Sequence, residues 1–334
     1  MSRTEPLLFA PQAGRGLAQA IAQELGLELA PLEEREFEDG EHKSRPLTGV
    51  RGRDVYLIQS LHGDATGSVN DRLVRLLLLI QALKDQGAAQ VTAVLPYLAY
   101  ARKDRRTQPR DPVNTRTVAQ LFEAVGTDRV LTLDVHNLAA YQNAFRIPAD
   151  HLEARPLFAR HLAPQLAGED VVVVSPDLGG VKRAEALRET LGGLLARPVG
   201  SAFVEKYRAR GEVWGEAVAG DVSGRVALIL DDLVASGTTL ARAARACRAQ
   251  GARRVLAAVT HGLFGAGAAG TLAEPALERL IITDSIWPPR PLPPDVAAKL
   301  TVLEIAPLLA EAIRRLATGG SLTALLEPPP PRLA

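Results

Sequence analysis

Residues 226–240 read VALILDDLVASGTTL: an apolar run, two adjacent carboxylates, and a loop of small and hydroxylated residues that leads into a helical pattern. The apolar run at 226–230 predicts a buried strand that ends before Asp231. Residues 236–239 predict a helix N-terminus, whose free backbone N–H groups and positive dipole end bind phosphate well. Two carboxylates would repel that phosphate, so we expect them to face sugar hydroxyls or a metal carried by the substrate. The segment therefore predicts a phosphosugar site, with an ordinary N-cap as the alternative.

Length and composition limit the class of protein. The chain has 334 residues, of which 47% are apolar, and a formal net charge of +1. This length suggests two domains, and the charge offers no electrostatic reason to bind nucleic acid or an acidic membrane. The single cysteine, Cys247, can form no intramolecular disulfide, which favours a reducing compartment. With neither a signal-peptide pattern nor a membrane-spanning apolar run, we expect a soluble cytoplasmic protein.

Short β-branched runs alternate with amphipathic stretches, which is typical of βαβ units around parallel sheets. The predicted strands are residues 6–9, 55–59, 91–95, 130–133, 171–175, 202–205, 227–230, 255–260 and 279–283. The predicted helices are residues 16–25, 70–86, 114–125, 181–190, 239–250, 267–272 and 306–317. We expect an α/β fold in which each domain is a mainly parallel sheet flanked by helices.

Two segments, 85–96 and 249–260, resemble each other as a helix end, a glycine and a strand. This likeness favours two similar α/β domains, although two common junctions could match by chance. We expect domains over residues 1–150 and 151–320. A Pro-rich tail over residues 321–334 should be disordered or peripheral.

Charged residues follow two of the predicted strands in the first half, where open α/β sheets bind ligands. Residues 102–110 carry five cations, which could bind a polyphosphate or form a solvated loop. Asp134-Val-His136 follows the strand at 130–133 and offers a potential Mg²⁺ ligand, with a structural histidine as the alternative.

The second half offers two similar features. Asp177 follows the strand at 171–175 and could help to hold Mg²⁺, with a turn or cap as the alternative. Lys206 and Arg208 flank Tyr207, so in extended backbone both would point toward one place. Two such cations suit the charge that spreads over a transferring phosphoryl group, and an exposed hairpin is the alternative.

Together these segments resemble the ribose-phosphate pyrophosphokinases (phosphoribosyl-pyrophosphate synthases), over about residues 7–327. The resemblance rests on segments in the family's order: FEDGE at 37–41, YARKDR at 100–105, DVH at 134–136 with SPDLGG at 175–180, EKYR at 205–208 and DDLVASGTT at 231–239. It implies two type I phosphoribosyltransferase-like domains, the first on the ATP side and the second binding ribose phosphate. It also implies transfer of pyrophosphate from Mg·ATP to the 1-hydroxyl of ribose 5-phosphate, giving 5-phosphoribosyl 1-pyrophosphate and AMP.

The resemblance assigns roles to individual residues. Lys206 and Arg208 would be catalytic, and His136 and Asp177 would contact Mg²⁺. The implied ATP-binding residues are Phe37, Asp39, Gly40, Glu41, Arg102, Lys103 and Asp104. The implied ribose-phosphate-binding residues are Asp231, Asp232, Ala235, Ser236, Gly237, Thr238 and Thr239. The implied partners are ATP, ribose 5-phosphate and further copies of the chain, in a dimer-based homo-oligomer up to a hexamer.

The chain departs from the family's usual pattern at several positions. Ala235 and Thr238 stand where an acidic residue and a glycine are usual, Lys103 stands where glutamine is common, and the stretch 61–69 is longer. Two other functions stay open: a phosphoribosyltransferase that consumes the product, and a non-catalytic paralogue that tunes an active enzyme. The ATP-like segments argue against the first. The intact Lys-x-Arg pair argues against the second, while Ala235 favours it.

Overall fold

The computed structural model describes residues 5–209, 212–287 and 290–326, and the side chains of 206–216 lie outside this description. The chain forms two compact units. Unit 1 comprises Met1–Leu152, Ser285–Trp287 and Glu304–Leu325, and unit 2 comprises Glu153–Asp284, Pro288–Leu303 and Leu326–Ala334. The first segment of unit 1 ends at Leu152. The expected second domain, however, is interrupted by two segments that belong to unit 1.

Unit 1 is built on a parallel sheet with the strand order β1-β4-β5-β6-β7. The strands are β1 (Leu7–Phe9), β4 (Asp54–Ile58), β5 (Gln90–Leu95), β6 (Arg129–Leu133) and β7 (Ala149–Leu152). The helices are η1 (Gln12–Gly14), α1 (Arg15–Leu25), α2 (Val69–Asp85), α3 (Asn114–Ala124) and α4 (Leu138–Ala144). The strands are apolar and buried along most of their length, as expected when a parallel sheet is covered on both faces.

The C-terminal helix belongs to this first unit. Helix α10 (Ala306–Thr318) packs against α1, and Arg314 Nη2 donates to the Glu24 carbonyl at 3.1 Å. The short helix η4 (Thr323–Leu325) follows it, so part of the expected tail is ordered in unit 1, and residues 327–334 lie outside the description. This assignment depends on a contact across most of the chain, which periodicity does not reveal.

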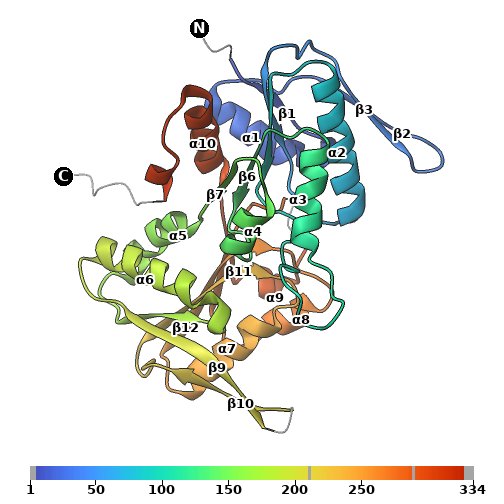
Figure 1. The fold of residues 1–334 in the computed structure, drawn as a ribbon. Helices are drawn as coiled ribbons and strands as arrows, with labels where there is room; N and C mark the ends of the chain where they lie inside the picture. The colour runs from blue at the N-terminus through green and yellow to red at the C-terminus, as the bar shows by residue number, and fades with distance from the viewer. Residues whose placement is uncertain (1–4, 210–211, 288–289, 327–334) are drawn as a thin grey trace. The chain divides into compact units, whose positions relative to one another are not determined.

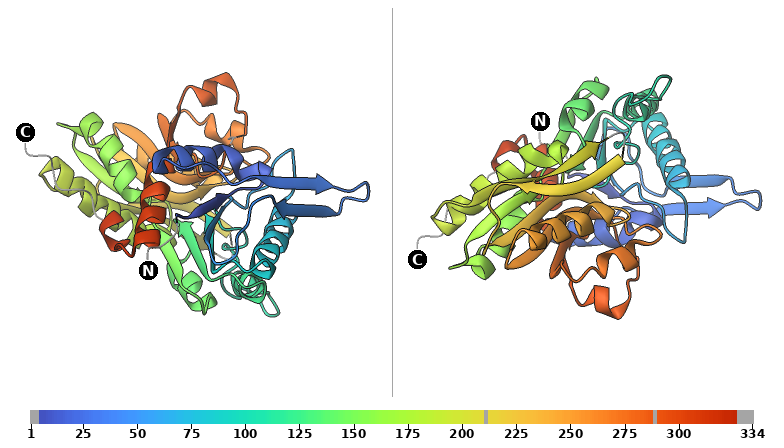
Figure 2. Two further views of the ribbon diagram at one scale, coloured as in Figure 1. Left: turned by 90° about the horizontal axis from the view of Figure 1, so that it is seen from above. Right: turned by 90° about the horizontal axis from the view of Figure 1, so that it is seen from below.

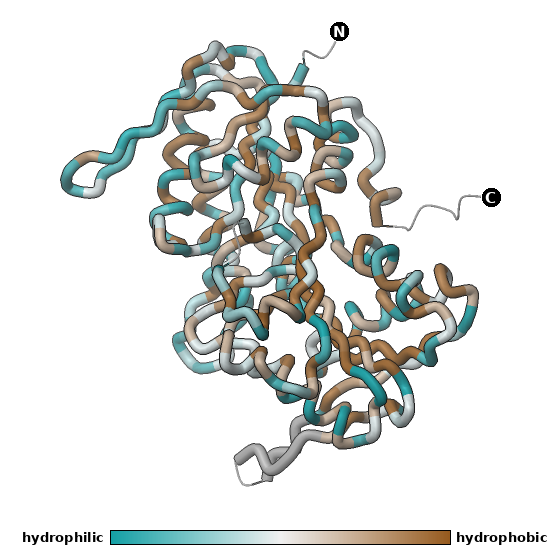
Figure 3. Tube along the Cα trace, turned by 180° about the vertical axis from the view of Figure 1, so that it is seen from behind, coloured by the Kyte–Doolittle hydropathy of each residue, from teal (hydrophilic) through white to brown (hydrophobic). Residues whose placement is uncertain are grey.

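A two-stranded antiparallel hairpin stands away from the main sheet of unit 1 (Figures 1 and 2). It consists of β2 (Leu32–Glu36) and β3 (His42–Pro46). Its residues are mostly hydrophilic, in contrast to the sheet strands (Figure 3). No strand was expected here, because the segment lacks the alternation of apolar and polar residues that predicts one.

Unit 2 contains a seven-stranded sheet with the order β10-β9-β8-β11-β12-β13-β14, parallel except for the edge strand β10. The strands are β8 (Val171–Ser175), β9 (Gly200–Ala209), β10 (Glu212–Ala219), β11 (Val226–Val234), β12 (Arg254–Gly262), β13 (Arg279–Thr283) and β14 (Leu300–Leu303). The helices are α5 (Arg155–Leu162), η2 (Pro164–Leu166), η3 (Leu178–Gly180), α6 (Val181–Leu195), α7 (Thr238–Ala249), α8 (Ala268–Leu272) and α9 (Pro294–Ala297).

The expected fold class is confirmed: both units are α/β with parallel sheets and flanking helices. Three strands extend by two or more residues past their expected ends, since β9, β11 and β12 run past residues 205, 230 and 260. Helices α4, α5 and α9 and strands β7 and β14 were not expected, because they are short or carry no clear period, and β10 was expected only in the alternative of an exposed hairpin. Among the described residues, no helix is both long and apolar enough to cross a membrane.

Candidate active site

The two carboxylates of the opening segment lie within strand β11 rather than after it. Strand β12 pairs with β11 as far as Val234, whereas β8 pairs with it only over 226–229. The strand therefore continues past its β8 neighbour, and Asp231 and Asp232 lie on this extension. The Asp232 N–H donates to Asp231 Oδ1 at 2.9 Å, which orients the first carboxylate.

An arginine from α6 joins this acidic pair. Arg183 Nη1 lies 3.1 Å from Asp232 Oδ1 and 3.8 Å from Asp231 Oδ1. The Asp232 side chain is only 5% exposed. Burial raises the pKa of Asp231 and the charge of Asp232 raises it further, while Arg183 opposes both effects. Sequence reasoning missed Arg183. The available signal was a cation in the first turn of a helix that directly follows a strand and a Gly-Gly turn.

The loop after β11 places a helix N-terminus beside the acidic pair. Gly237 has φ +77° in the left-handed region, and α7 begins at Thr238 without a side-chain hydrogen bond to its cap in the described structure. The Ser236 and Thr238 hydroxyl oxygens lie 3.0 Å apart. The Ala235 carbonyl accepts from Gly265 N at 2.8 Å, which anchors the loop. Ser236 Oγ accepts from Thr238 N at 3.4 Å, a weak contact of the kind that the N-cap alternative predicts. A helix start of this kind can also bind an anion, so both interpretations stay open.

Asp177 lies in the loop that follows β8, the strand next to β11. Its Oδ1 accepts from Gly179 N at 2.9 Å and from Gly180 N at 3.2 Å. The carboxylate thus forms the cap that was the alternative to a metal ligand. His136 is exposed after β6 in unit 1. In the described part of the chain, no three His, Cys, Asp or Glu side chains form a metal-binding group.

The residues predicted to hold the adenosine lie at the tip of the β2–β3 hairpin. Gly40 turns the chain with φ +89°, and Asp39 Oδ1 accepts from Glu41 N at 3.1 Å. Phe37 is 39% exposed, and the Arg35 guanidinium lies 4.8 Å from its ring centroid. The hairpin therefore presents an aromatic ring and carboxylates on an exposed tip.

The loop after β5 contains the other predicted ATP residues and reaches the loop after β6. Asn137 Nδ2 donates to Asp104 Oδ2 at 2.5 Å, so Asp104 is tied to the residue next to His136. Arg102 is exposed. The structure thus brings together two segments that the sequence placed at the ends of neighbouring strands.

Lys103 is bound within its own loop. Its ammonium pairs with the Asp111 carboxylate and lies 3.0 Å from Thr107 Oγ1. Asp111 Oδ2 also accepts from Gln108 N at 2.9 Å. The Lys103 ammonium and then the Thr107 hydroxyl hold the pKa of Asp111 well below its usual range. Lys103 therefore closes this loop, a contact that the sequence did not predict.

Lys206 and Arg208 lie two residues apart in strand β9, opposite Glu216 and Val213 of β10. The backbone is thus the hairpin that was the alternative to a phosphoryl-binding pair. The side chains of both residues lie outside the description, so their predicted role stays a prediction.

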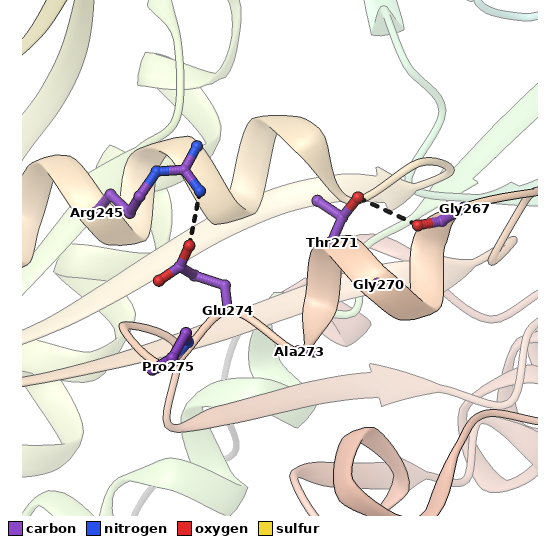
Figure 4. Close-up of a pocket in the computed structure, with 7 residues that line it drawn as sticks. All are labelled: Arg245, Gly267, Gly270, Thr271, Ala273, Glu274 and Pro275. Carbon is purple, nitrogen blue, oxygen red and sulfur yellow. Dashed lines mark hydrogen bonds and ion pairs between the residues drawn. The ribbon is translucent and has the colours of Figure 1, made fainter.

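A shallow hollow of about 620 Å³ lies on unit 2 beside α8 (Figure 4). Arg245 Nη1 donates to Glu274 Oε2 across it at 2.6 Å, and Thr271 Oγ1 donates to the Gly267 carbonyl at 3.2 Å. None of the predicted site residues lines this hollow. The candidate site is therefore defined by the end of β11 rather than by this hollow.

Comparison with known proteins assigns the family. The family model described as the N-terminal domain of ribose phosphate pyrophosphokinase matches residues 7–126, and the phosphoribosyl synthetase-associated domain matches residues 212–327. The chain is 41% identical over 321 residues to the ribose-phosphate pyrophosphokinase of Brucella melitensis, covering 96% of this chain and 99% of that one. It is 39% identical over 320 residues to that of Caldanaerobacter subterraneus, covering 95% and 96%.

A solved structure agrees with these relatives. The phosphoribosylpyrophosphate synthetase from Mycobacterium smegmatis superimposes with a TM-score of 0.85 at 36% identity, covering 95% of this chain and 100% of that one. Identity at this level extends over nearly the full length of both chains. The chain therefore belongs to the ribose-phosphate pyrophosphokinase family.

Proposed function

We propose that this chain transfers the pyrophosphoryl group of Mg·ATP to the 1-hydroxyl of ribose 5-phosphate. In this reaction the 1-hydroxyl oxygen bonds to the β-phosphorus and loses its proton, the bond from that phosphorus to the α-bridging oxygen breaks, and AMP leaves. The proposal is carried by one observation: a carboxylate pair and a helix N-terminus lie at the end of one strand, in a chain of this family.

The acceptor would bind along the end of β11 and the start of α7. Asp231 and Asp232 would accept hydrogen bonds from the ribose hydroxyls, which are neutral donors. Residues 235–239 would hold the 5-phosphate through backbone N–H groups and the hydroxyls of Ser236, Thr238 and Thr239. The acidic pair and the helix N-terminus then orient the two ends of one substrate, which is the positioning that this chemistry requires.

The donor would bind to the segments of unit 1. Phe37 offers an exposed ring for the adenine, with Asp39, Gly40 and Glu41 beside it. Arg102 and Lys103 would contact the phosphates, with Asp104 holding the loop. Lys103 would have to leave Asp111 to do so. Lys206 and Arg208 of β9 would stabilise the charge on the transferring group.

We propose that the reaction uses a magnesium ion that has few protein ligands. Asp177 supplies carboxylate oxygen, and both of its backbone bonds use the same oxygen, Oδ1. Oxygen donors suit Mg²⁺ better than imidazole, so we propose that His136 contacts the ion through water. When bound, Mg²⁺ would neutralise charge on the phosphate oxygens of ATP.

Two further properties belong to the proposal. The single cysteine suits a reducing compartment, so we place the protein in the cytoplasm. We also propose a homo-oligomer, because Val74 and Leu78 lie one turn apart on α2 and are both more than half exposed. Light scattering of the purified protein tests this state, and a monomer at all concentrations would contradict it.

Substrate use is tested by ³¹P NMR of the purified protein with Mg·ATP and ribose 5-phosphate. We expect AMP and phosphoribosyl pyrophosphate to appear in equal amounts, and neither to appear when ribose 5-phosphate is left out. A product that forms only from added phosphoribosyl pyrophosphate and a base would instead indicate a phosphoribosyltransferase. No product with any divalent metal would contradict the proposal and favour a non-catalytic paralogue.

A further inference from the structure

The acidic pair at the end of β11 poses an electrostatic problem that the proposed function does not solve. Two carboxylates that are adjacent in sequence repel each other, and Asp232 is almost fully buried. Burial and like charge both favour a protonated carboxyl in this place. A protonated carboxyl loses an acceptor position that a ribose hydroxyl needs. The pKa of Asp231 stays raised, to about 8, even with an arginine beside it, so the oxygens that remain as acceptors must be turned toward the ribose hydroxyls.

Arg183 is placed to do this. One guanidinium nitrogen, Nη1, lies within ion-pair distance of both carboxylates, at 3.1 Å from Asp232 and 3.8 Å from Asp231. Each contact is made to an Oδ1 atom, and Asp231 Oδ1 also accepts the Asp232 N–H. The Oδ1 atoms are thus turned toward α6, which fixes the rotation of both carboxyl groups.

The position of Arg183 is itself fixed by its surroundings. The residue lies in the first turn of α6, directly after the Gly179-Gly180 turn that Asp177 caps. Its side chain is about one-fifth exposed, so the ion pair is partly screened from water. Of the two strands that pair with β11, β12 brings the histidine His261, opposite Leu233, and β8 brings no titratable side chain over its length.

We propose that Arg183 is a positioning residue for the sugar-phosphate acceptor, which pairs with Asp232 and fixes which oxygens of Asp231 and Asp232 meet the ribose hydroxyls. This role rests on the proposed function, because it assumes that the pair binds ribose. Since Arg183 acts through the two carboxylates, its loss should weaken binding of ribose 5-phosphate. It should leave binding of ATP and the transfer step nearly unchanged.

The test compares Arg183→Gln and Arg183→Lys with Lys182→Gln, which removes a cation from the neighbouring, exposed position of the same turn. Calorimetry gives the Kd for ribose 5-phosphate, and steady-state kinetics give kcat and KM for each substrate. We expect Arg183→Gln to raise Kd and KM for ribose 5-phosphate about tenfold or more, because a misplaced carboxylate would lose about one hydrogen bond to the sugar. The KM for ATP and kcat should change less than about twofold.

Arg183→Lys should recover most of the affinity because it keeps the charge, and Lys182→Gln should match the wild type. If the wild type binds ribose 5-phosphate and Arg183→Gln binds it with the same Kd, the role of Arg183 is refuted, but the proposed function is not. An equal loss of affinity for both substrates with a lowered Tm, not rescued by lysine, would indicate a merely structural residue and also overturn it. A wild type that does not bind ribose 5-phosphate would instead refute the proposed function, and this inference with it.

Discussion

Gly237→Ala tests whether the loop before α7 depends on its geometry. Gly237 has φ +77°, and an L-residue in this region costs about 1–2 kcal/mol. An added Cβ would lie 3.0 Å from both Cγ and Cδ2 of Leu272, so the Leu272 side chain would have to shift. Such overpacking costs about 1 kcal/mol or more. We therefore expect a loss of about 2–3 kcal/mol in the free energy of unfolding of unit 2, or a Tm lower by about 6–9 °C.

The matched control is Gly224→Ala in the same unit. Gly224 has a similar φ of +71°, but nothing lies within 4 Å of an added Cβ. Gly224→Ala should lower the free energy of unfolding only by the cost of the left-handed backbone, about 1–2 kcal/mol. It should bind ribose 5-phosphate like the wild type. In Gly237→Ala the displaced N–H groups of Thr238 and Thr239 should weaken that binding about tenfold. Urea unfolding and calorimetry measure both effects, and equal behaviour of the two variants would refute the reasoning.

Three further predictions concern single side chains. Burial opposes ionisation of Asp64, but hydrogen bonds from Thr66 and the Arg72 ion pair outweigh it and lower its pKa from 3.8 to about 2. The stabilisation of the folded state by the charged Asp64 is fully present above pH 3.8 and is lost as the pH falls toward 2. In urea unfolding, Asp64→Asn should therefore lower the free energy of unfolding by about 2 kcal/mol at pH 7 and by little at pH 2. A loss that does not depend on pH would contradict this. Asp111→Asn should release the loop at 103–111, and trypsin should cut there several times faster, whereas an unchanged rate would show that the ion pair does not hold the loop. Burial raises the pKa of Cys247 to about 12, so its thiol should react with Ellman's reagent at pH 8 only after unfolding, and fast labelling of the folded protein would disprove it.

The sheets could be predicted from the sequence because their strands are buried and apolar. The strands at 171–175 and 279–283 have the predicted bounds, since each is mainly β-branched or aliphatic, with polar residues only at the ends. The hairpin of β2 and β3 could not be predicted this way, because its side chains face water on most sides and need no apolar period. Helix α10 was predicted, but its packing against α1 joins residues that are nearly 300 positions apart.

The candidate site could be predicted only in part, again because contacts between distant segments do not follow from the local sequence. Asp231, Asp232 and Gly237 stand in one short segment, so their order along the chain already indicates a sugar-phosphate site. Arg183 stands 49 positions from Asp232 and meets it only because α6 lies beside β11. The Lys103–Asp111 pair depends on how the loop folds back on itself. The sequence thus predicts site residues that lie close together along the chain, but it does not predict contacts between residues on different helices and strands.

The central claim, that an intact pyrophosphoryl group moves to the sugar phosphate, is tested most directly with ATP labelled at the β-phosphorus. The purified protein is incubated with [β-³²P]ATP, Mg²⁺ and ribose 5-phosphate, and the nucleotides and sugar phosphates are separated. The account predicts that the label moves into phosphoribosyl pyrophosphate and that the AMP is unlabelled. Label retained in ADP, with only the γ-phosphoryl group transferred, would contradict it.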